Sequence, residues 1–240
     1  MTRANRVAKV GEFFRDMKIE RTMKTYLSLL AFVCSALILS GCAGGVRDTS
    51  RTFRTVVIDA GHGGHDSGAT SRAGGAEKNA TLDVALMLND KLRAAGFRTV
   101  MTRTDDTFIP LDTRAAISNG QNNAIFVSIH FNDSPRRGIR GVETYYNSRL
   151  AIPLAEKIER SLSALSPYRG VMHANFRVLR KNIFPAVLVE CGFLSNPGEG
   201  SRCANASYQQ AIAERLAEGI TAQRGERSPE PEPPSVAVTR

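Results

Sequence analysis

The hydrophobic pattern of the chain switches repeatedly between a strand-like and a helix-like period. Short runs rich in β-branched and aromatic residues, bounded by glycine or polar residues, predict about six strands. They are residues 56–59, 97–101, 124–130, 141–146, 176–179 and 186–190. The run at 141–146 follows the preceding strand so closely that an antiparallel position beside the others is expected.

Between these runs, apolar residues recur every three or four positions, as they do along one face of an amphipathic helix. The helices predicted in this way span residues 77–95, 111–119, 152–165 and 208–222. Gly96 and Gly120 stand where the first two should end, because glycine is favoured just after a helix. The alternation predicts an α/β fold, with a mostly parallel or mixed sheet of about six strands and helices on both faces.

An apolar run at residues 26–40 lies before the predicted domain and is preceded by Lys18, Arg21 and Lys24. A helix needs roughly 20 apolar residues to cross a bilayer, so this run is short for a membrane span. A basic flank followed by a short apolar run is typical of a secretory signal, which we assign to residues 1–41.

The apolar run ends in Leu39-Ser40-Gly41-Cys42, which resembles the lipidation motif of bacterial lipoproteins. This resemblance implies that Cys42 carries the lipid and becomes the first mature residue. It implies an envelope protein on a lipid anchor. Since Ala43 follows, the expected place is the periplasmic face of the outer membrane, if the source has two membranes.

The rest of the chain divides by composition into three parts. We expect a linker at residues 42–52, a catalytic domain at 53–222, and a disordered tail rich in proline and glutamate at 223–240.

The net charge favours an acidic partner, but only moderately. The whole chain carries a formal charge of +9, and removing residues 1–41 takes away seven basic and three acidic residues, which leaves +5. Cell-wall polymer remains a suitable partner. No arginine-rich arm or interleaved aromatic stripe supports binding to nucleic acid, so no nucleic-acid partner is expected.

The loop after the first predicted strand, GHGGHDSGA from Gly61, contains glycines, histidines and an aspartate. Such a loop can hold phosphate, hold a metal or simply turn the chain. The dinucleotide fingerprint fails because Asp66 stands at the position of its last glycine. The P-loop pattern fails because Ala69 stands where its lysine is required. Phosphate binding is therefore disfavoured.

A metal site is favoured by where the other polar residues fall. His62 follows the first strand, His130 closes the strand at 124–130, and Glu190 closes the strand at 186–190. Ligands gather at the carboxyl ends of strands in open α/β sheets. Glu77 opens the helix directly after the loop. Two imidazoles and one carboxylate form a known catalytic zinc set, and a second carboxylate nearby can serve as a general base.

Each of these residues also has a structural interpretation. His62 fits a loop histidine, His130 a core histidine, and Glu77 a carboxylate that favours the helix N-terminus. Glu190 is harder to explain in this way, because burying a carboxylate without a partner is costly.

The remaining histidines and cysteines carry weaker signals. We expect solvent or substrate contact for His65, and a structural or surface position for His173. Cys191 and Cys203 would lie in an oxidising compartment, and the sequence does not decide whether they form a disulfide.

Several blocks in a fixed order resemble the zinc-dependent N-acetylmuramoyl-L-alanine amidases of the Amidase_3 type. They are VVIDAGHGGHDSGA, then Glu77, then VMTRTDDTFIPLDTRAAISN, FVSIHFND, GVETYY and PAVLVECGFLSNP. The resemblance implies a three-layer α/β/α fold, with His62, Glu77 and His130 as ligands of one Zn²⁺ and Glu190 as the catalytic glutamate. It implies cleavage of the amide between N-acetylmuramic acid and L-alanine in peptidoglycan.

One departure from the family bears on regulation. Cell-division amidases of this type carry a long insertion with an autoinhibitory helix, whereas only about 38 residues separate Tyr146 from Pro185 here. We therefore expect no autoinhibitory helix and no obligatory protein activator. The alternatives are a related zinc peptidase or deacetylase, and a wall-binding lipoprotein with an inactive site.

Overall fold

A computed structural model describes residues 45–71 and 75–225. The predicted signal segment 1–41, the predicted lipid site Cys42 and residues 226–240 of the predicted tail lie outside the described residues.

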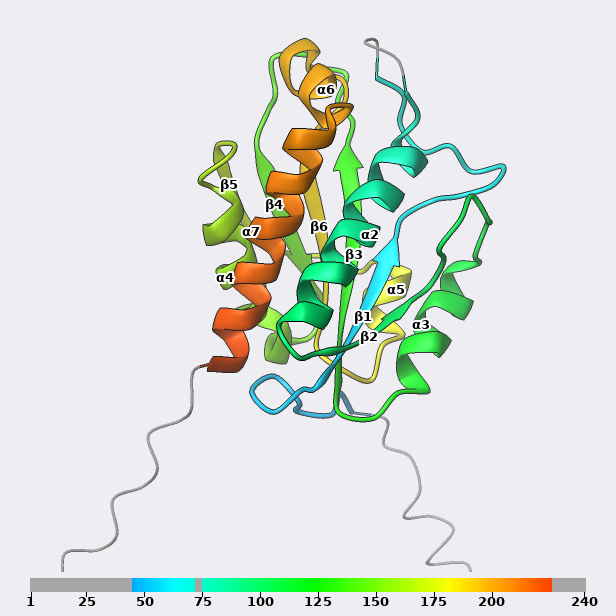
Figure 1. Ribbon diagram of the computed structural model, residues 1–240, viewed down its shortest axis with the longest axis vertical. Helices are drawn as coiled ribbons and strands as arrows, with labels where there is room; N and C mark the ends of the chain where they lie inside the picture. The colour runs from blue at the N-terminus through cyan, green and yellow to red at the C-terminus, as the bar shows by residue number, and fades with distance from the viewer. Residues whose placement is uncertain (1–44, 72–74, 226–240) are drawn as a thin grey trace, which may run out of the picture. The chain divides into compact units, whose positions relative to one another are not determined.

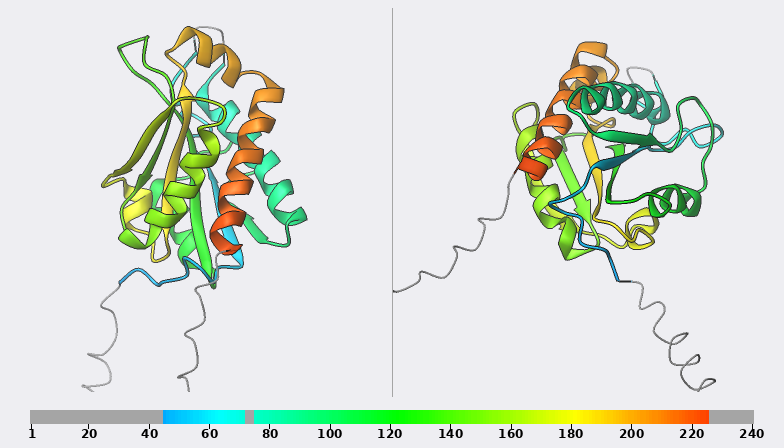
Figure 2. Two further views of the ribbon diagram at one scale, coloured as in Figure 1. Left: turned by 90° about the vertical axis from the view of Figure 1, so that its left-hand side faces the viewer. Right: turned by 60° about the horizontal axis from the view of Figure 1, so that its bottom comes forward.

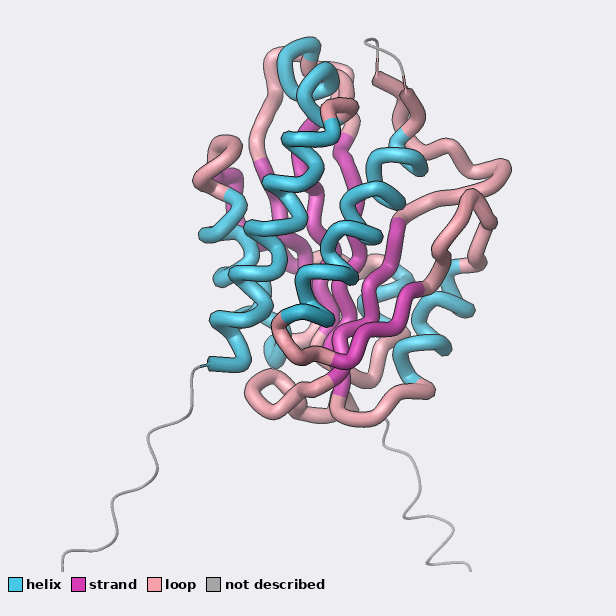
Figure 3. The backbone as a smooth tube through the Cα atoms, viewed as in Figure 1, coloured by secondary structure: helices cyan, strands magenta, loops and turns pink. Residues whose placement is uncertain are grey.

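A single six-stranded sheet forms the centre of the described domain (Figure 1, Figure 3). Its order is β2-β1-β3-β6-β4-β5. The strands are β1 (Thr55–Ala60), β2 (Arg98–Met101), β3 (Ala124–Asn132), β4 (Val142–Tyr146), β5 (Tyr168–His173) and β6 (Ala186–Phe193). The first four in the sheet order run parallel to one another, whereas β4 runs antiparallel to β6, and β5 runs parallel to β4. The prediction of a mixed α/β sheet is therefore confirmed.

Helices cover both faces of this sheet. They are α2 (Glu77–Ala94), α3 (Leu111–Asn119), α4 (Ile152–Leu162), α5 (Arg177–Arg180), α6 (Pro197–Cys203) and α7 (Ala206–Gly225), with a short 3₁₀ turn η1 (Arg149–Ala151) before α4. One face packs against α2, α4 and α7, and the other against α3 and α5 (Figure 2). This is the expected three-layer arrangement.

The core consists of two apolar clusters, one on each side of the sheet. The larger cluster lies under α2, α4 and α7 and includes Ile58, Leu88 and Leu154. The smaller lies under α3 and α5 and includes Val57, Phe126 and Leu188. Strands buried on both faces read as nearly continuous apolar runs, which is why β1, β3 and β6 could be predicted from the sequence.

The prediction of a strand at residues 176–179 is wrong. These residues lead into the single-turn helix α5, whose adjacent Val178 and Leu179 pack with Phe184 in the smaller cluster. A short apolar run has no periodicity that separates strand from helix. The sixth strand is instead β5, at the edge of the sheet, and its half-exposed residues give no apolar run.

The domain is wider than residues 53–222. Before it, the Arg47 amide donates to the Ile183 carbonyl at 2.6 Å, and the Thr49 hydroxyl donates to the Ala124 carbonyl at 2.5 Å. After it, the Gln223 side-chain amide donates to the Ser50 carbonyl at 2.8 Å. The last residues of the expected linker and the first of the expected tail are therefore folded parts of the domain.

No helix within residues 45–71 and 75–225 is both long and apolar enough to cross a membrane.

Candidate metal centre

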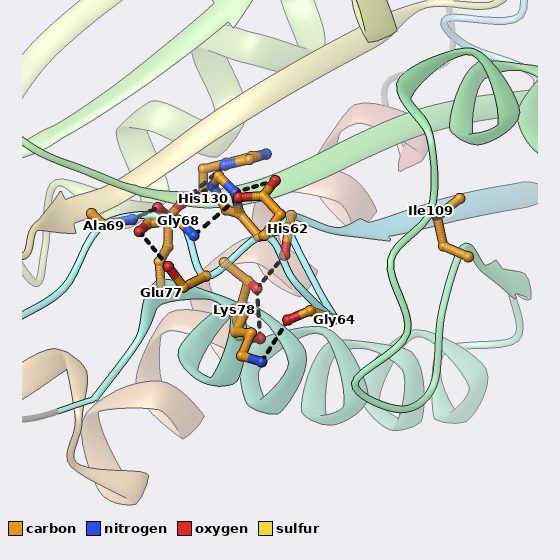
Figure 4. Close-up of polar contacts among 12 residues, drawn as sticks. His62, Gly64, Gly68, Ala69, Glu77, Lys78, Ile109 and His130 are labelled. Atoms are coloured by element: carbon orange, nitrogen blue, oxygen red, sulfur yellow. Dashed lines mark hydrogen bonds and ion pairs between the residues drawn. The ribbon is translucent and has the colours of Figure 1, made fainter.

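Three predicted ligand residues meet at the carboxyl ends of β1 and β3 (Figure 4). His62 lies in the loop after β1, Glu77 is the first residue of α2, and His130 lies near the end of β3. Glu77 Oε1 is 3.0 Å from His62 Nε2 and 3.0 Å from His130 Nδ1. The candidate ligand atoms of the three residues all lie within 4.8 Å of one another.

The glycines of the loop make this convergence sterically feasible. A Cβ on Gly61 would lie 2.4 Å from the His130 ring, and a Cβ on Gly68 would lie 2.5 Å from Glu77 Oε2. Gly68 also has a φ of +62°, in the left-handed region that glycine adopts most readily. His62 itself has a φ of 60°, which is uncommon for a residue with a side chain and is often found at functional sites.

Two buried arginines donate hydrogen bonds to the backbone at the start of the loop. Arg103 donates from Nε to the Ala60 carbonyl at 3.0 Å and from Nη2 to the Gly61 carbonyl at 2.8 Å. Arg114 donates from Nη2 to the His62 carbonyl at 2.6 Å, and its Nη1 is 2.9 Å from Asp59 Oδ1. Charge-assisted bonds from these arginines to the backbone therefore help to hold the ligand loop in place.

Two backbone amides and one aspartate orient the candidate ligands. Glu77 Oε1 accepts from the Phe131 amide at 2.9 Å, and Glu77 Oε2 accepts from the Ala69 amide at 2.9 Å. His62 Nδ1 lies 2.9 Å from Asp66 Oδ2, at ion-pair distance but without hydrogen-bond alignment. A carboxylate beside the second nitrogen of a histidine is a common outer partner of metal-binding imidazoles.

The electrostatics of the cluster keep the Glu77 carboxylate ionised beside the two imidazoles. Burial acts against the charged carboxylate, but hydrogen bonds from His130 and His62 hold the pKa of Glu77 well below its usual range. Burial likewise acts against a charged imidazole, but Glu77 and Asp66 raise the pKa of His62. The carboxylate stays ionised and draws positive charge to this point.

Glu190 lies one strand away from the cluster. It occupies β6 directly opposite His130, in the parallel register of β3 and β6. Its Oε2 is buried and has no hydrogen-bond partner among the described residues. Burial, reinforced by the nearby charges of Glu77 and Glu143, raises its pKa to about 7. An unpaired buried carboxylate with a raised pKa is a feature of functional sites.

A cleft of about 380 Å³ opens beside the cluster. Its lining includes His62 and His130, and its outer part is formed by Phe108, Leu111 and Phe176, whose side chains are exposed. Exposed aromatic side chains next to a polar cluster are typical of ligand sites.

Among the described residues, the other histidines and cysteines do not enter the cluster. The ring of the exposed His65 lies tilted against Phe108 with 4.1 Å between ring centroids, and the exposed His173 ends β5. Cys191 and Cys203 are both buried free thiols, so the structure contains no bridge between them.

The sequence did not reveal the residues that support the site. None of the five residues that contact the candidate ligands, their loop or the row of residues beside them was predicted: Asp59, Asp66, Arg103, Arg114 and Glu143. For the two arginines there was a signal, since each lies within an apolar-flanked segment where an unpaired charge would be costly to bury.

Fold and site together define a three-layer α/β protein with a two-histidine, one-glutamate donor set, which is a donor set of catalytic zinc sites. Residues 56–222 match the model of the Amidase_3 family, described as N-acetylmuramoyl-L-alanine amidase. The chain belongs to this family of amide-hydrolysing enzymes.

Curated relatives and solved structures agree with this assignment. YqiI of Bacillus subtilis, described as an uncharacterized protein, is 36% identical over 199 residues, which are 80% of this chain and 94% of YqiI. The N-acetylmuramoyl-L-alanine amidase LytC of the same organism is 36% identical over 171 residues, 69% of this chain but only 34% of LytC. An N-acetylmuramoyl-L-alanine amidase from Clostridium difficile 630 superposes with a TM-score of 0.68 at 35% identity, covering 71% of this chain and 96% of that one.

One further solved structure bears on partners. The CwlD amidase from Clostridioides difficile, determined in complex with the GerS lipoprotein, has a TM-score of 0.65 and 30% identity, covering 71% of this chain and 98% of CwlD.

Proposed function

We propose that this protein hydrolyses the amide bond between N-acetylmuramic acid and L-alanine in peptidoglycan, using one Zn²⁺ per chain. The observation that carries the proposal is the convergence of His62, Glu77 and His130 beside the unpaired carboxylate of Glu190. Family membership and the similarity to LytC support the reaction class.

The donor set fits zinc. Two imidazole nitrogens and one carboxylate oxygen suit Zn²⁺, which takes three protein ligands in catalytic sites and leaves a further position for water or substrate. The same set is poorly suited to Mg²⁺ or Ca²⁺, which prefer oxygen ligands. When bound, zinc lowers the pKa of a coordinated water to about 7 and polarises a carbonyl.

The protein residues supply the proton transfers and the geometry. Glu190 Oε2 is positioned to take a proton from the attacking water and to return it to the departing alanine nitrogen. Amine departure requires that proton, because an unprotonated amide nitrogen is a poor leaving group. Asp66, Arg103 and Arg114 hold His62 and its loop, so that the site is organised before substrate binds.

The cleft fits a polymer substrate, since it is open and is flanked by the exposed side chains of Phe108, Leu111 and Phe176. Aromatic faces suit the apolar faces of sugar rings.

We also propose that the enzyme needs no protein activator. Residues 147–185 are taken up by η1, α4, β5, α5 and their connections. Of these, α4 packs on α7 and the opposite face of the sheet, and only the segment around α5 lines the cleft. The CwlD–GerS complex is a reason to test this point directly. The lipid on Cys42 and the place in the envelope are part of the proposal and rest on the lipidation motif.

The test is product analysis with a protein that begins at Cys42, carrying Cys42→Ser. Purified peptidoglycan is incubated with this protein alone, and new α-amino groups are labelled and identified. New N-terminal L-alanine is expected without any added partner. Cleavage within the peptide would instead indicate a peptidase, and released acetate a deacetylase. Cosedimentation with the wall without any product would indicate a tether with an inactive site.

A further inference from the structure

We propose that Arg169 binds a carboxylate of the stem peptide on the leaving-group side of the scissile amide. The inference rests on the proposed amidase function and names a recognition element for its substrate. It concerns the side of the site formed by β4 and β5, away from the three candidate metal ligands.

Four chemistry-bearing residues form a row along one edge of the sheet, where β3 and β6 approach their carboxyl ends and β4 and β5 begin. His130 on β3 lies opposite Glu190 on β6, and Glu190 lies opposite Glu143 on β4. Arg169 follows on β5, where its Nε is 2.6 Å from Glu143 Oε1. Directly opposed residues project from the same face of a sheet, so the row runs from metal ligand to proton-transfer group to cation.

The order of the row sets the direction in which the substrate lies. The departing alanine nitrogen must be next to Glu190, which returns the proton to it. The acyl side of the amide then lies toward the cleft lined by His62 and Phe108. The peptide side extends past Glu143 toward Arg169.

Arg169 is held as a preorganised guanidinium with one edge free. Its Nε is engaged by Glu143, and its Cζ lies over the Phe193 ring, 5.4 Å from the ring centroid. No hydrogen bond within the described residues occupies Nη1 or Nη2, and 36% of the side chain is exposed. Paired terminal nitrogens of arginine bind a carboxylate with two parallel hydrogen bonds.

The surroundings of Glu143 hold the ion pair between Glu143 and Arg169 in one geometry. Its carboxylate is buried, and it also accepts from the Tyr145 hydroxyl at 2.7 Å and from the Asn132 side-chain amide at 2.8 Å. All three donors restrain the carboxylate, which in turn restrains the guanidinium.

The distance between Glu190 and Arg169 fits a substrate carboxylate that lies two residues from the scissile bond. Neighbouring strands lie about 4.8 Å apart, so Arg169 is roughly 10 Å from Glu190 along the row, less the reach of its side chain. Two extended residues span about 7 Å. The second residue of the stem, which is an acidic amino acid or its amide, therefore reaches the free edge of the guanidinium.

A purely structural role is the alternative, in which Arg169 only neutralises buried Glu143. The two roles differ in their dependence on the substrate. Loss of a neutralising charge would slow the cleavage of all substrates alike. Loss of a carboxylate receptor would slow only the cleavage of substrates with a free carboxylate at that position.

The experiment compares N-acetylmuramoyl-L-Ala-D-Glu with N-acetylmuramoyl-L-Ala-D-isoGln, each with its γ-carboxyl blocked as a methylamide. The D-Glu substrate then has one free carboxylate, the α-carboxylate, and the D-isoGln substrate has none. The zinc-loaded protein starting at Cys42→Ser is assayed as wild type, Arg169→Gln and Arg215→Gln. Arg215 is a matched control because it is 37% exposed, pairs with Glu218 at 2.7 Å and lies on α7 across the sheet.

We expect wild type to prefer the D-Glu substrate about tenfold or more in kcat/KM. Arg169→Gln should erase that preference through a rise in KM for the D-Glu substrate, while Arg215→Gln keeps it. Equal cleavage of both substrates by wild type, or an equal loss on both in Arg169→Gln, overturns the inference. If Arg169→Gln does not fold, the inference is decided by the wild-type ratio of kcat/KM for the D-Glu and D-isoGln substrates. Wild type that releases no alanyl peptide from either substrate or from peptidoglycan refutes the proposed function itself.

Discussion

Glu190 and the candidate ligand Glu77 have different surroundings, although Glu190 lies only one strand away from His130, which contacts Glu77. Glu77 is surrounded by donors and stays ionised, whereas Glu190 Oε2 is buried without a donor. The contrast fits the two proposed roles, Glu77 as a metal ligand and Glu190 as the group that exchanges a proton.

Replacing Glu190 by glutamine tests that separation. The amide keeps the volume of the side chain but cannot take a proton, so turnover should fall about 10²- to 10⁴-fold. Zinc content and thermal unfolding should remain those of wild type. Steady-state assays alongside metal analysis check this, and a variant with near-normal kcat would remove Glu190 from the mechanism.

The pH dependence of activity should follow the same carboxylate. Burial is the main cause of the pKa of about 7 without metal, and a bound cation favours the charged form, so the pKa of Glu190 falls below 7 in the loaded enzyme. The working form is the carboxylate, so kcat/KM should rise with pH through that pKa. A pH profile of kcat/KM measures this acidic limb, and a limb well above pH 7 would contradict the assignment.

Replacing His130 by alanine should weaken metal binding before it affects the fold. It removes one of three donors, so zinc should be lost to a competing chelator at a far lower chelator concentration than in wild type. His65→Ala is the control, because that exposed residue lies outside the cluster. Equal zinc retention by the two variants would argue against His130 as a ligand.

At this scale, some residues were predictable and others were not. His62, His130 and Glu190 could be placed because each lies at or just after the end of an apolar run that marks a buried strand. Arg114, Asp59 and Glu143 could not, because what joins them to the site is the packing of distant segments.

The glycine loop between β1 and α2 is the element that brings the ligands together. Its tight turns allow Glu77 to approach β3 from the start of α2, and buried Arg103 and Arg114 fix its backbone. A turn of this kind needs left-handed residues where side chains would collide, which explains the glycines better than phosphate binding does.

Gly68→Ala tests the role of the loop, with Gly96→Ala as its control. Both glycines have positive φ, so each substitution should destabilise the fold by about 1–2 kcal/mol. Only at Gly68 does the added Cβ meet Glu77 and His62, at 2.5 and 2.7 Å, whereas at Gly96 it meets nothing within 4 Å. Zinc affinity, measured by competition, should therefore fall in Gly68→Ala alone, and an equal effect in both variants would be inconsistent with this account.

The strands that are buried on both faces were the clearest in the sequence, and the one missed strand lies at the edge of the sheet. β1, β3 and β6 are covered on both faces and are visible as apolar runs. β5 lies at the edge of the sheet with half-exposed residues, so its apolar pattern is weak. The strand was predicted instead at 176–179, because Val178 and Leu179 form a short apolar run there.

The whole domain extends beyond the residues that match the family. Residues 46–52 and 223–225 are tied to each other and to β3 through Gln223, Ser50 and Thr49. Loss of these buried bonds should make a protein of residues 53–222 less stable than one of residues 46–225, by about 1–3 kcal/mol. Urea unfolding of the two proteins measures the difference, and equal midpoints would show that the flanks contribute nothing.

The central claim joins a reaction to a metal, so one titration tests it most directly. Chelator-treated protein carrying Cys42→Ser is given increasing Zn²⁺, and its digest of purified peptidoglycan is followed by mass spectrometry. Stem peptides beginning with L-alanine, together with peptide-free glycan, should be absent without metal and rise to a plateau at one zinc per chain. Full release of these products by the metal-free protein, or none at any zinc level, would contradict the account.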